Sequence, residues 1–494
     1  MIRIIPKKAR LWLCAAALTA LATAGAQAQS VDFFKSNYAA NPSAGRSIAR
    51  GWDNNFYFTG SHFTGGSNNS DLLLVKIKPN GDTLWTRTLP SPDRSENGFC
   101  VLTPLSNEVM VAGISFDTVS GRSARAFLIQ FNDSGRLVWR KDYPIAGKTT
   151  AVANMLRLNN GFALCGTIAD DSTGNIDAWL LRTDLNGNKL WDRSYGGALY
   201  DDAWQIERTP NGGFMLAGGS YSYRTGTRHD DAWLVKTDDS GRQIWNKHYG
   251  NADTVDWIWS LAPVGNPAQP TGYIFTGVKN RNPSRFRSEM FLARVDTAGN
   301  VLWDKRMVGP FDMREGLAIE PTFNGTFYVL GSEFDASGNG QLLALNIDSN
   351  GNILNELRYT SLSGEWLIPR NIFINNLGDA YVTGQQVLPG NNSNAFVARI
   401  KNINNIPAAV ETVAAPSAIR VYPNPATKVC TVISEGEAMT RLVVRDLSGR
   451  VLREISRPAP HAQTIALEDL PRGMVVITVY TSGIAPVNLK LSVE

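Results

Sequence analysis

The stretch DAWLVKTDDSGRQIWNKHY at residues 231–249 decides the fold of this 494-residue chain. Apolar and polar residues alternate on both sides of residues 238–241, a pattern typical of two antiparallel strands joined by a tight turn. Upstream, residues 202–209 and 214–218 flank a second turn at 210–213. Because nothing in this pattern has the 3.6-residue period of a helix, we expect four antiparallel strands that form one small sheet.

The motif Gly-x-x-x-Trp from this stretch recurs along the chain at intervals of about 52 to 58 residues. A repeat of this length is typical of the blades of a β-propeller. Five copies end in Trp85, Trp139, Trp191, Trp245 and Trp303, and a sixth has Asn355 in that place. We expect these tryptophans to pack between neighbouring blades; the alternative is that they are platforms on which sugars stack.

The two ends of the repeat region determine the number of blades. A seventh copy covers residues 365–400 and lacks a fourth strand. Residues 33–38 resemble residues 190–195, with Phe34 in the place of Trp191. The sequence therefore predicts an all-β chain in which residues 29–406 form a seven-bladed β-propeller closed by the N-terminal strand, which also covers an exposed edge. Six blades with a separate N-terminal piece, or an incompletely closed array, are the alternatives.

Composition and charge exclude several classes of protein. Hydrophobic residues make up 43% of the chain and charged residues 19%, with 44 Gly and 24 Pro, which excludes a charge-rich disordered chain and a coiled coil. Four of the 48 basic residues, Arg3, Lys7, Lys8 and Arg10, lie in the N-terminal leader, and removing them leaves 44 basic against 44 acidic residues. With no basic excess, nucleic acid and anionic membrane surfaces are not expected partners.

Residues 1–28 have the pattern of a secretory signal peptide. Basic residues precede an apolar run at 11–24, and Ala26-Gln27-Ala28 forms a small-residue cleavage site. The run is shorter than the ~20 residues that a membrane-spanning helix needs, and no later segment has such a run, so the mature chain is expected to have no transmembrane helix. Cys100, Cys165 and Cys430 remain after cleavage; they are too scattered for a disulfide framework, and we expect buried apolar side chains.

The composition changes after residue 406. Residues 407–417 contain prolines at both ends and no period, as in an extended linker. Residues 418–494 contain short alternating stretches separated by Pro, Asn and Gly, which predicts a small Ig-like antiparallel β-sandwich. Its most regular features are Tyr422-Pro423-Asn424-Pro425, an Asp446-x-x-Gly449-Arg450 turn, Gly473 and Lys490.

In their order and their place at the end of the chain, these features resemble the type A C-terminal sorting domain of the type IX secretion system. The resemblance implies that the signal peptide directs the chain to the periplasm and that the tail engages the type IX secretion machinery for passage through the outer membrane. The protein would then be secreted or held at the cell surface. An ordinary accessory sandwich is the alternative. The repeats also resemble those of other secreted proteins that precede such a tail, which indicates architecture and not chemistry.

One set of residues could form a site. The positions about 11 residues beyond each Trp position, where the first strand of the next blade begins, are Gly45, Glu96, Thr150, Asp202, Asp256, Glu315 and Glu365. In a propeller these positions surround one mouth of the central channel. The five acids could accept hydrogen bonds from backbone amides, hold a divalent cation through oxygen ligands, or include a catalytic carboxylate pair of the kind that glycosidases use.

No other motif indicates catalysis. The four histidines lack zinc-site spacing, and Gly147-Lys148-Thr149 lacks the upstream glycine of a phosphate-binding loop. His229 could act as a base, although a solvated loop histidine is the simpler interpretation. The irregular loops at 220–229 and 277–287 are candidates for partner contacts. The sequence favours a secreted or surface propeller that binds a glycan or protein, with a secreted glycosidase-like hydrolase as the alternative; it identifies no cofactor.

Overall fold

The computed structural model describes the chain in two compact units, Met1–Ala408 and Ala409–Glu494. All secondary-structure elements of the described residues are β-strands. The predicted signal peptide and linker lie outside the described residues. The description leaves out residues 1–28, 37, 40–41, 65–68, 92, 119–123, 224–230, 251–254, 283–286, 308–312, 335–339, 361–364, 389–391, 404–418, 423–425, 435–437, 447–449, 482–486 and 494.

The first unit consists of consecutive four-stranded antiparallel groups, here called sheets 1 to 7. In each, a strand is followed by a tight turn and its antiparallel neighbour, as the alternation predicts. The strands of sheets 1 to 3 are β2 (Ser43–Arg50), β3 (Phe56–Phe63), β4 (Ser70–Ile77) and β5 (Thr83–Leu89); β6 (Arg94–Leu102), β7 (Val109–Asp117), β8 (Ala124–Phe131) and β9 (Leu137–Tyr143); and β10 (Lys148–Leu158), β11 (Gly161–Asp170), β12 (Ile176–Thr183) and β13 (Lys189–Tyr195).

Sheets 4 to 7 repeat this arrangement, and a single pair, Ser288 with Met313, joins sheets 5 and 6. Their strands are β14 (Gln205–Arg208), β15 (Phe214–Ser220), β16 (Asp231–Thr237) and β17 (Gln243–Tyr249); β18 (Val255–Asn266), β19 (Gln269–Asn282), β20 (Arg287–Asp296) and β21 (Val301–Met307); β22 (Met313–Pro321), β23 (Phe327–Phe334), β24 (Gly340–Ile347) and β25 (Ile353–Tyr359); and β26 (Trp366–Ile374), β27 (Ala380–Leu388) and β28 (Asn392–Lys401) with β1 (Ser30–Ser36).

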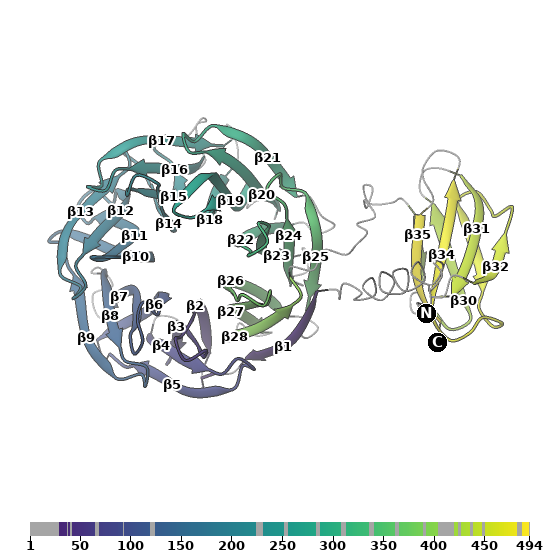
Figure 1. Ribbon diagram of the computed structural model, residues 1–494, viewed down its shortest axis with the longest axis horizontal. Coiled ribbons are helices and arrows are strands. Elements are labelled where there is room, and N and C mark those ends of the chain that lie inside the picture. The colour runs from purple at the N-terminus through teal and green to yellow at the C-terminus, as the bar shows by residue number, and fades with distance from the viewer. Residues whose placement is uncertain are drawn as a thin grey trace, which may run out of the picture. The chain divides into compact units, whose positions relative to one another are not determined.

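Figure 1 shows these sheets arranged around a common centre. Their first strands, β2, β6, β10, β14, β18, β22 and β26, lie nearest the centre and are called the inner strands here. Each sheet contacts the sheet that follows it, and strands of sheet 7 contact β2 of sheet 1. Backbone amides reinforce some of these junctions: Val101 donates to Ser47 Oγ between sheets 1 and 2 at 3.2 Å, and Ile48 donates to Asn371 Oδ1 between sheets 1 and 7 at 3.0 Å.

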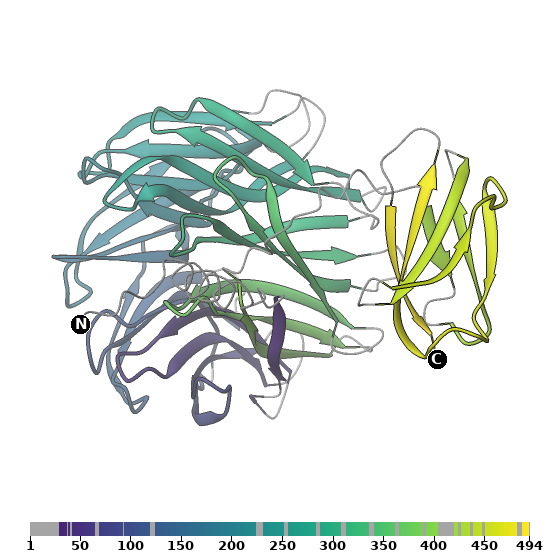
Figure 2. The ribbon, with the colours of Figure 1, turned by 45° about the vertical axis from the view of Figure 1, so that its right-hand side comes forward.

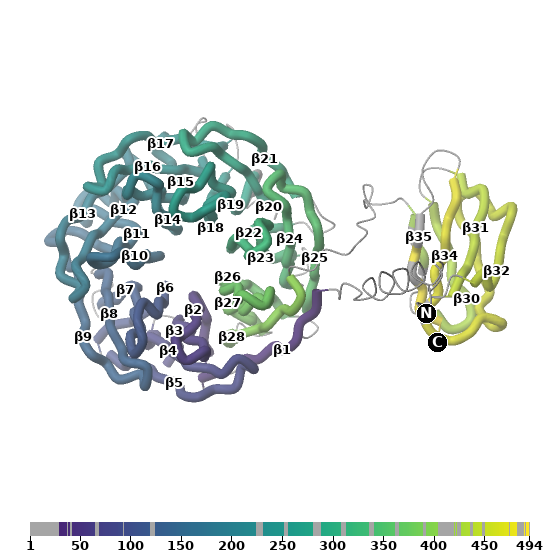
Figure 3. The backbone as a smooth tube through the Cα atoms, viewed as in Figure 1, coloured from purple at the N-terminus to yellow at the C-terminus, as the bar shows by residue number. Residues whose placement is uncertain are grey.

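The N-terminal strand supplies the outer strand of sheet 7. β1 pairs antiparallel with β28 over six residue pairs, from Ser30 with Lys401 to Ser36 with Phe396. In Figure 3, purple β1 runs beside green β28, where the first and last parts of this unit meet. The predicted use of the N-terminal strand to complete the last sheet is therefore confirmed.

The predicted place of Phe34 is wrong by one residue. Trp191 packs against the turn glycine Gly241 of the next sheet, and in the same way the ring of Phe33 packs against Gly81. Phe34 points to the other side of β1, where its ring lies 5.0 Å from that of Phe396. The alignment counted back from Tyr38, but the chain has one extra residue between Phe33 and Tyr38, so the register shifts.

The repeated tryptophans pack between neighbouring sheets, as expected. A tryptophan of one sheet lies against the turn glycine of the next in five pairs. Each of these glycines has a positive φ, which a residue without a side chain adopts at little cost. The pairs are Trp85 with Gly135, Trp139 with Gly187, Trp191 with Gly241, Trp245 with Gly299 and Trp303 with Gly351.

The second unit consists of two small sheets, and Figures 1 and 2 show it as strands joined by turns. Its core is apolar, with Leu442, Ile477 and Leu491 fully buried. One sheet has the order β29 (Ile419–Tyr422), β30 (Val429–Ser434), β33 (Ala462–Ala466), and the other has the order β32 (Val451–Ile455), β31 (Met439–Asp446), β34 (Gly473–Thr481), β35 (Val487–Val493). Among the described residues of the chain, no helix is long and apolar enough to cross a membrane.

Candidate functional site

The predicted acids lie where the inner strands begin, and Glu96 is the one most clearly held by an ion pair. It is buried in β6. Arg140 Nη1 lies 2.7 Å from its carboxylate, and Ser115 Oγ donates to it at 3.1 Å. A buried carboxylate with these partners holds strands of sheet 2 together.

Asp202 is buried just before β14 and accepts four hydrogen bonds. The donors are the Gly219 backbone amide at 2.8 Å, Trp204 Nε1 at 2.8 Å, Trp257 Nε1 at 3.1 Å and the Tyr200 hydroxyl at 3.0 Å. Burial raises the pKa of Asp202 to about 6, although these hydrogen bonds act to lower it. Asp202 therefore fixes the orientation of two indole rings.

The three remaining acids are spread over sheets 5, 6 and 7. Glu365 is buried and accepts a hydrogen bond from Gln386 Nε2 at 2.5 Å. Asp256 is buried in β18, and Glu315 is half-buried in β22. Within the described parts of the chain, no group of three or more His, Cys, Asp or Glu residues is placed to hold a metal ion. The binding ring of Glu96, Asp202, Asp256, Glu315 and Glu365 stays a prediction.

Six of the seven inner strands carry a β-bulge that the sequence analysis missed, and the residues just before β14 have the same pattern. In β2, for example, Gly45 pairs with Gly60 and Ser47 with Thr59, so that Arg46 is the extra residue. In sheet 4, Gln205 pairs with Ala217 while the Trp204 amide donates to the Ala217 carbonyl, so Trp204 occupies the same place. A bulge redirects a side chain out of the regular alternation. The seven residues, called bulge residues here, are Arg46, Phe99, Ala153, Trp204, Trp259, Leu317 and Arg370.

A glycine of the second strand faces each bulge. A Cβ atom on Gly277 would lie closer than 3.0 Å to the Trp257 carbonyl oxygen, so only glycine fits against the distorted inner strand. The seven glycines are Gly60, Gly113, Gly166, Gly218, Gly277, Gly331 and Gly384. They recur at nearly regular spacing. This period is the signal that could have located the bulges.

All seven bulge residues line one cavity of about 390 Å³ at the centre of the sheets, called the central cavity here. The residue that follows each bulge also lines it, and Glu320 completes the lining. The volume lies within the range of about 300 to 1,000 Å³ that is usual for small-molecule sites. Five of the residues that follow a bulge are polar: Ser47, Asn154, Gln205, Ser260 and Asn371.

A second cavity of about 460 Å³ shares part of this lining and reaches the other ends of the inner strands. Two carboxyl groups, Glu207 and Glu320, line it. Burial, together with the nearby charge of Glu320, raises the pKa of Glu207 to about 8. Burial raises the pKa of Glu320 to about 7. Carboxyl groups with such pKa values can donate a proton near neutral pH.

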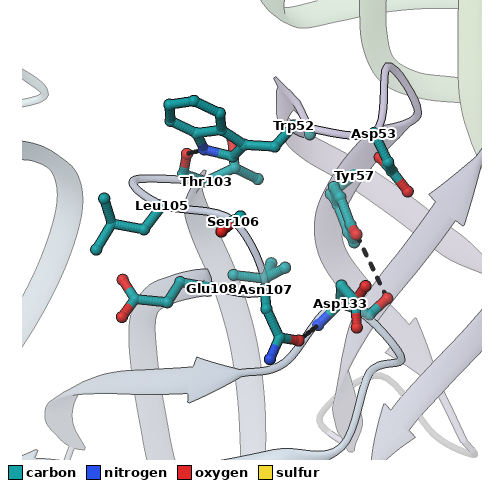
Figure 4. A pocket seen from close by; sticks show the side chains of 11 residues that line it. Trp52, Asp53, Tyr57, Thr103, Leu105, Ser106, Asn107, Glu108 and Asp133 are labelled. Carbon is teal, nitrogen blue, oxygen red and sulfur yellow. Dashed lines mark hydrogen bonds between the residues drawn. The ribbon is translucent and has the colours of Figure 1, made fainter.

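A smaller pocket of about 240 Å³ lies between the turns of sheets 1 and 2 (Figure 4). Trp52 is 66% exposed at its rim, and its indole N–H donates to the Thr103 carbonyl at 3.1 Å. The Tyr57 hydroxyl donates to the Asp133 carbonyl at 3.3 Å, as drawn in Figure 4. The exposed indole offers a flat apolar surface outside the central cavity.

Of the other residues singled out in the sequence, those that the structure describes do not form a site. Gly147-Lys148-Thr149 leads into strand β10 and not into a helix, and Lys148 pairs with Asp170 at 2.7 Å. Cys100, Cys165 and Cys430 are buried and free, as expected. His229 lies outside the described residues, as do parts of the loops at 220–229 and 277–287.

The tail features are described in part. Asp446 ends β31 and accepts the Arg450 backbone amide at 3.1 Å, while Arg450 Nε also lies 3.1 Å from its carboxylate. Gly473 begins β34 with a φ of 113°, which favours glycine. Tyr422 ends β29, and Lys490 lies within β35. Pro423, Asn424, Pro425 and Gly449 lie outside the described residues.

The molecule is thus an all-β protein with a short C-terminal unit, and comparison with known proteins characterises that unit. Residues 420–493 match the family described as the secretion system C-terminal sorting domain. This domain indicates export by the type IX secretion system, so the protein is secreted or displayed at the cell surface. No curated protein matches the chain.

Several solved structures resemble the chain at low identity. An α-L-arabinofuranosidase from Fusarium graminearum is 13% identical, with a TM-score of 0.42, over 66% of this chain and 99% of its own. A puromycin hydrolase is 12% identical, with a TM-score of 0.44, over 80% of this chain and 59% of its own. A protein of unknown function from Dyadobacter fermentans is 10% identical, with a TM-score of 0.42, over 75% of this chain and 98% of its own. At these TM-scores the likeness carries no argument about chemistry.

Proposed function

We propose that residues 29–406 form a seven-bladed β-propeller closed by the N-terminal strand, with sheets 1 to 7 as its blades. In this proposal a signal peptide (1–28) directs the chain to the periplasm. A linker (407–417) and a sorting domain (418–494) follow the propeller, and the sorting domain engages the type IX secretion machinery for passage through the outer membrane. The pairing of β1 with β28 and the contacts of sheet 7 with β2 support closure.

The export route has a direct test. A chain that ends at residue 417 should accumulate in the periplasm, whereas the full chain should reach the surface or the medium. A matched control chain with a substituted exposed residue of the propeller, Leu185→Ser, should be exported like the parent. Equal export of the truncated chain would contradict the proposed role of the tail.

We infer that the mature protein is an extracellular binding protein whose ligand, a glycan, enters the central cavity. The observation that carries this proposal is the cavity lining: seven bulges turn side chains of seven blades toward one space, and their types differ from blade to blade. Residues that only hold blades together recur, as the inter-blade tryptophans do, whereas residues that select a ligand need not.

The test is a glycan-array and pull-down screen with the mature protein and an Ala153→Trp variant, whose indole would fill part of the central cavity. Leu185→Trp, an exposed position in the turn before β13, is the matched control. Binding that is lost in Ala153→Trp and kept in Leu185→Trp supports the central cavity. Binding that survives in Ala153→Trp would contradict it and would direct attention to Trp52 or to a protein ligand on the loops.

A secreted glycosidase-like hydrolase is the second candidate, favoured by the raised pKa values of Glu207 and Glu320. The acids predicted from the sequence are less suitable, because Glu96 and Asp202 are already engaged by several hydrogen-bond donors. Release of reducing sugar from a bound glycan, abolished by Glu320→Gln with binding retained, would establish the hydrolase. Binding without release by the parent protein would exclude it for that glycan.

A further inference from the structure

Two arginines of the central cavity form no ion pair with any residue that the structure describes, although the charge of Glu315 acts on one of them. Arg46 and Arg370 are bulge residues of neighbouring inner strands, β2 and β26. The Nε atom of each is buried and has no hydrogen-bond partner among the residues that the structure describes. Some other arginines pair with acids, as Arg140 does with Glu96 at 2.7 Å and Arg399 with Asp379 at 2.6 Å, whereas the buried Arg182 donates to backbone carbonyls and to Asn160. Arg46 and Arg370 differ from these arginines in that both line the central cavity, where they can donate hydrogen bonds to a ligand.

The two guanidinium groups also repel each other. Burial and the charge of Arg370 lower the pKa of Arg46 to about 9. Burial lowers the pKa of Arg370, and the charge of Glu315 opposes that change only in part. The Arg46 guanidinium lies 5.4 Å from the centre of the Phe99 ring, which stabilises a cation without neutralising it. A guanidinium group keeps its proton at neutral pH, so this wall of the cavity is positive and costs stability while no anion is bound.

The wall across the cavity is aromatic. The rings of Trp204 and Trp259 lie 5.4 Å apart, inclined by 62°. Figure 1 shows that the strands β14 and β18 lie across the centre from β2 and β26. Asp202 holds Trp204 through its indole N–H, whereas the indole N–H of Trp259 is buried without an acceptor among the described residues. An indole face suits the C–H face of a sugar ring, and a free N–H suits an oxygen of the ligand.

Amide and hydroxyl side chains also line the central cavity. Gln205 follows Trp204 in β14, Ser260 follows Trp259, and Asn371 follows Arg370. Their oxygens already accept hydrogen bonds within the protein: Gln205 Oε1 from the Asn154 amide group, Ser260 Oγ from the Ile319 backbone amide and Asn371 Oδ1 from the Ile48 backbone amide. The amide N–H groups and the hydroxyl hydrogen can still donate to the oxygens of a sugar. An aromatic acid would use the positive and the aromatic wall but not these groups.

We propose that the central cavity recognises an acidic saccharide: Arg46 and Arg370 bind its carboxylate or sulfate oxygens, and its sugar ring packs against Trp204 and Trp259. This inference rests on the proposed glycan-binding function and gives its ligand class. Arginine suits either oxyanion, because its planar guanidinium donates two parallel hydrogen bonds to two oxygens.

The experiment measures binding of the mature protein to galacturonate oligomers, to sulfated galactose oligomers and to neutral galactose oligomers of equal length, on an array and by calorimetry. At least one acidic series should bind ten times or more tightly than its neutral counterpart. The Arg46→Gln/Arg370→Gln variant should lose at least tenfold in affinity for that series and should be no less heat-stable than the parent, because it removes two repelling charges. Arg87→Gln, on the outer strand of sheet 1, is the matched control and should bind like the parent.

The outcomes separate this inference from the proposed function. Stronger binding of carboxylate than of sulfate, or the reverse, identifies which oxyanion the arginines receive. Equal binding of acidic and neutral series, lost in Ala153→Trp, would overturn the acidic ligand and leave the glycan-binding cavity intact. Binding of acidic glycans that Ala153→Trp does not weaken would overturn both. Failure of every acidic series to bind would overturn the acidic ligand.

Discussion

Removal of residues 29–38 should destabilise the first unit strongly, because these residues supply the outer strand of sheet 7. β1 forms six residue pairs with β28. The ring of Phe34 lies 5.0 Å from Phe396 and 5.7 Å from Tyr359, and the ring of Phe33 lies 6.4 Å from Tyr381. The truncation deletes all of these contacts and exposes the edge of β28, which should promote aggregation.

The magnitude follows from the two rings. Truncating a fully buried Phe to Ala costs about 3 to 5 kcal/mol. Since Phe33 and Phe34 are both half-buried, we take about 2 kcal/mol for each, or about 4 kcal/mol together. That is a large part of the ~5 to 15 kcal/mol by which domains are stable, and at about 2 °C for each kcal/mol it lowers the melting temperature by about 8 °C.

The assay compares thermal melts, followed by circular dichroism, of the mature chain, the truncated chain and Phe33→Ala/Phe34→Ala. Phe116→Ala, a 39%-exposed ring at the end of β7, is the matched control and should cost under about 1 kcal/mol. The truncated chain should melt lower than the double variant, since it also loses the strand pairing. A truncated chain that stays monomeric and melts within about 2 °C of the parent would refute the role of β1.

Two further predictions concern the glycines that face the bulges and the second cavity, which Glu207 and Glu320 line. Gly277→Ala should lower the free energy of unfolding by about 3 kcal/mol, because the new Cβ would collide with the Trp257 carbonyl. Gly325→Ala, at a φ of 81° with no atom within 4 Å, should lower it by only about 1 to 2 kcal/mol. The urea concentrations at which the two variants unfold test this order, and the reverse order would contradict the close approach of Gly277 to Trp257. Glu207 and Glu320 have pKa values of about 8 and 7 when folded, above the usual 4.5, so folding takes up protons and the free energy of unfolding should fall as the pH rises from about 5 to 8. Melting temperatures across that range should flatten in Glu207→Gln/Glu320→Gln, and an unchanged slope would show that other groups cause it.

The sequence was sufficient for the strands and insufficient for the site. Alternation and the Trp period predicted the four-stranded groups and the use of the N-terminal strand, because both depend on contacts that repeat. The alignment placed Phe34 instead of Phe33 at the Trp position, because one extra residue before Tyr38 does not alter the spacing of the Trp repeats. Acids at strand starts were visible as a pattern. The partners of Glu96, and two of the four partners of Asp202, come from other strands and could not be predicted by counting along the chain.

The proximity of Arg46 and Arg370 could not be predicted from the sequence either. Arg46 and Arg370 are more than 300 residues apart in sequence, and neither belongs to a recognisable motif. Their proximity depends on the first and last sheets meeting, and their direction depends on bulges that interrupt the strand alternation. The sequence signal that could have predicted a bulge residue is the glycine opposite it, as at Gly60 and Gly384.

The central claim, that the central cavity is open to solutes and positive, is tested most directly by the reactivity of a cysteine placed in it. Ala153→Cys puts a thiol among the bulge residues. Cys100 also lines the central cavity, but burial raises the pKa of its thiol to about 11, so it should react slowly. The mature parent protein, which contains Cys100, measures this background reaction. An anionic methanethiosulfonate should modify the introduced thiol about tenfold faster than a cationic one, relative to their rates with a free thiol. In Arg46→Gln/Arg370→Gln the ratio should fall to about one. A thiol that does not react, or that reacts faster with the cationic reagent, would contradict the claim.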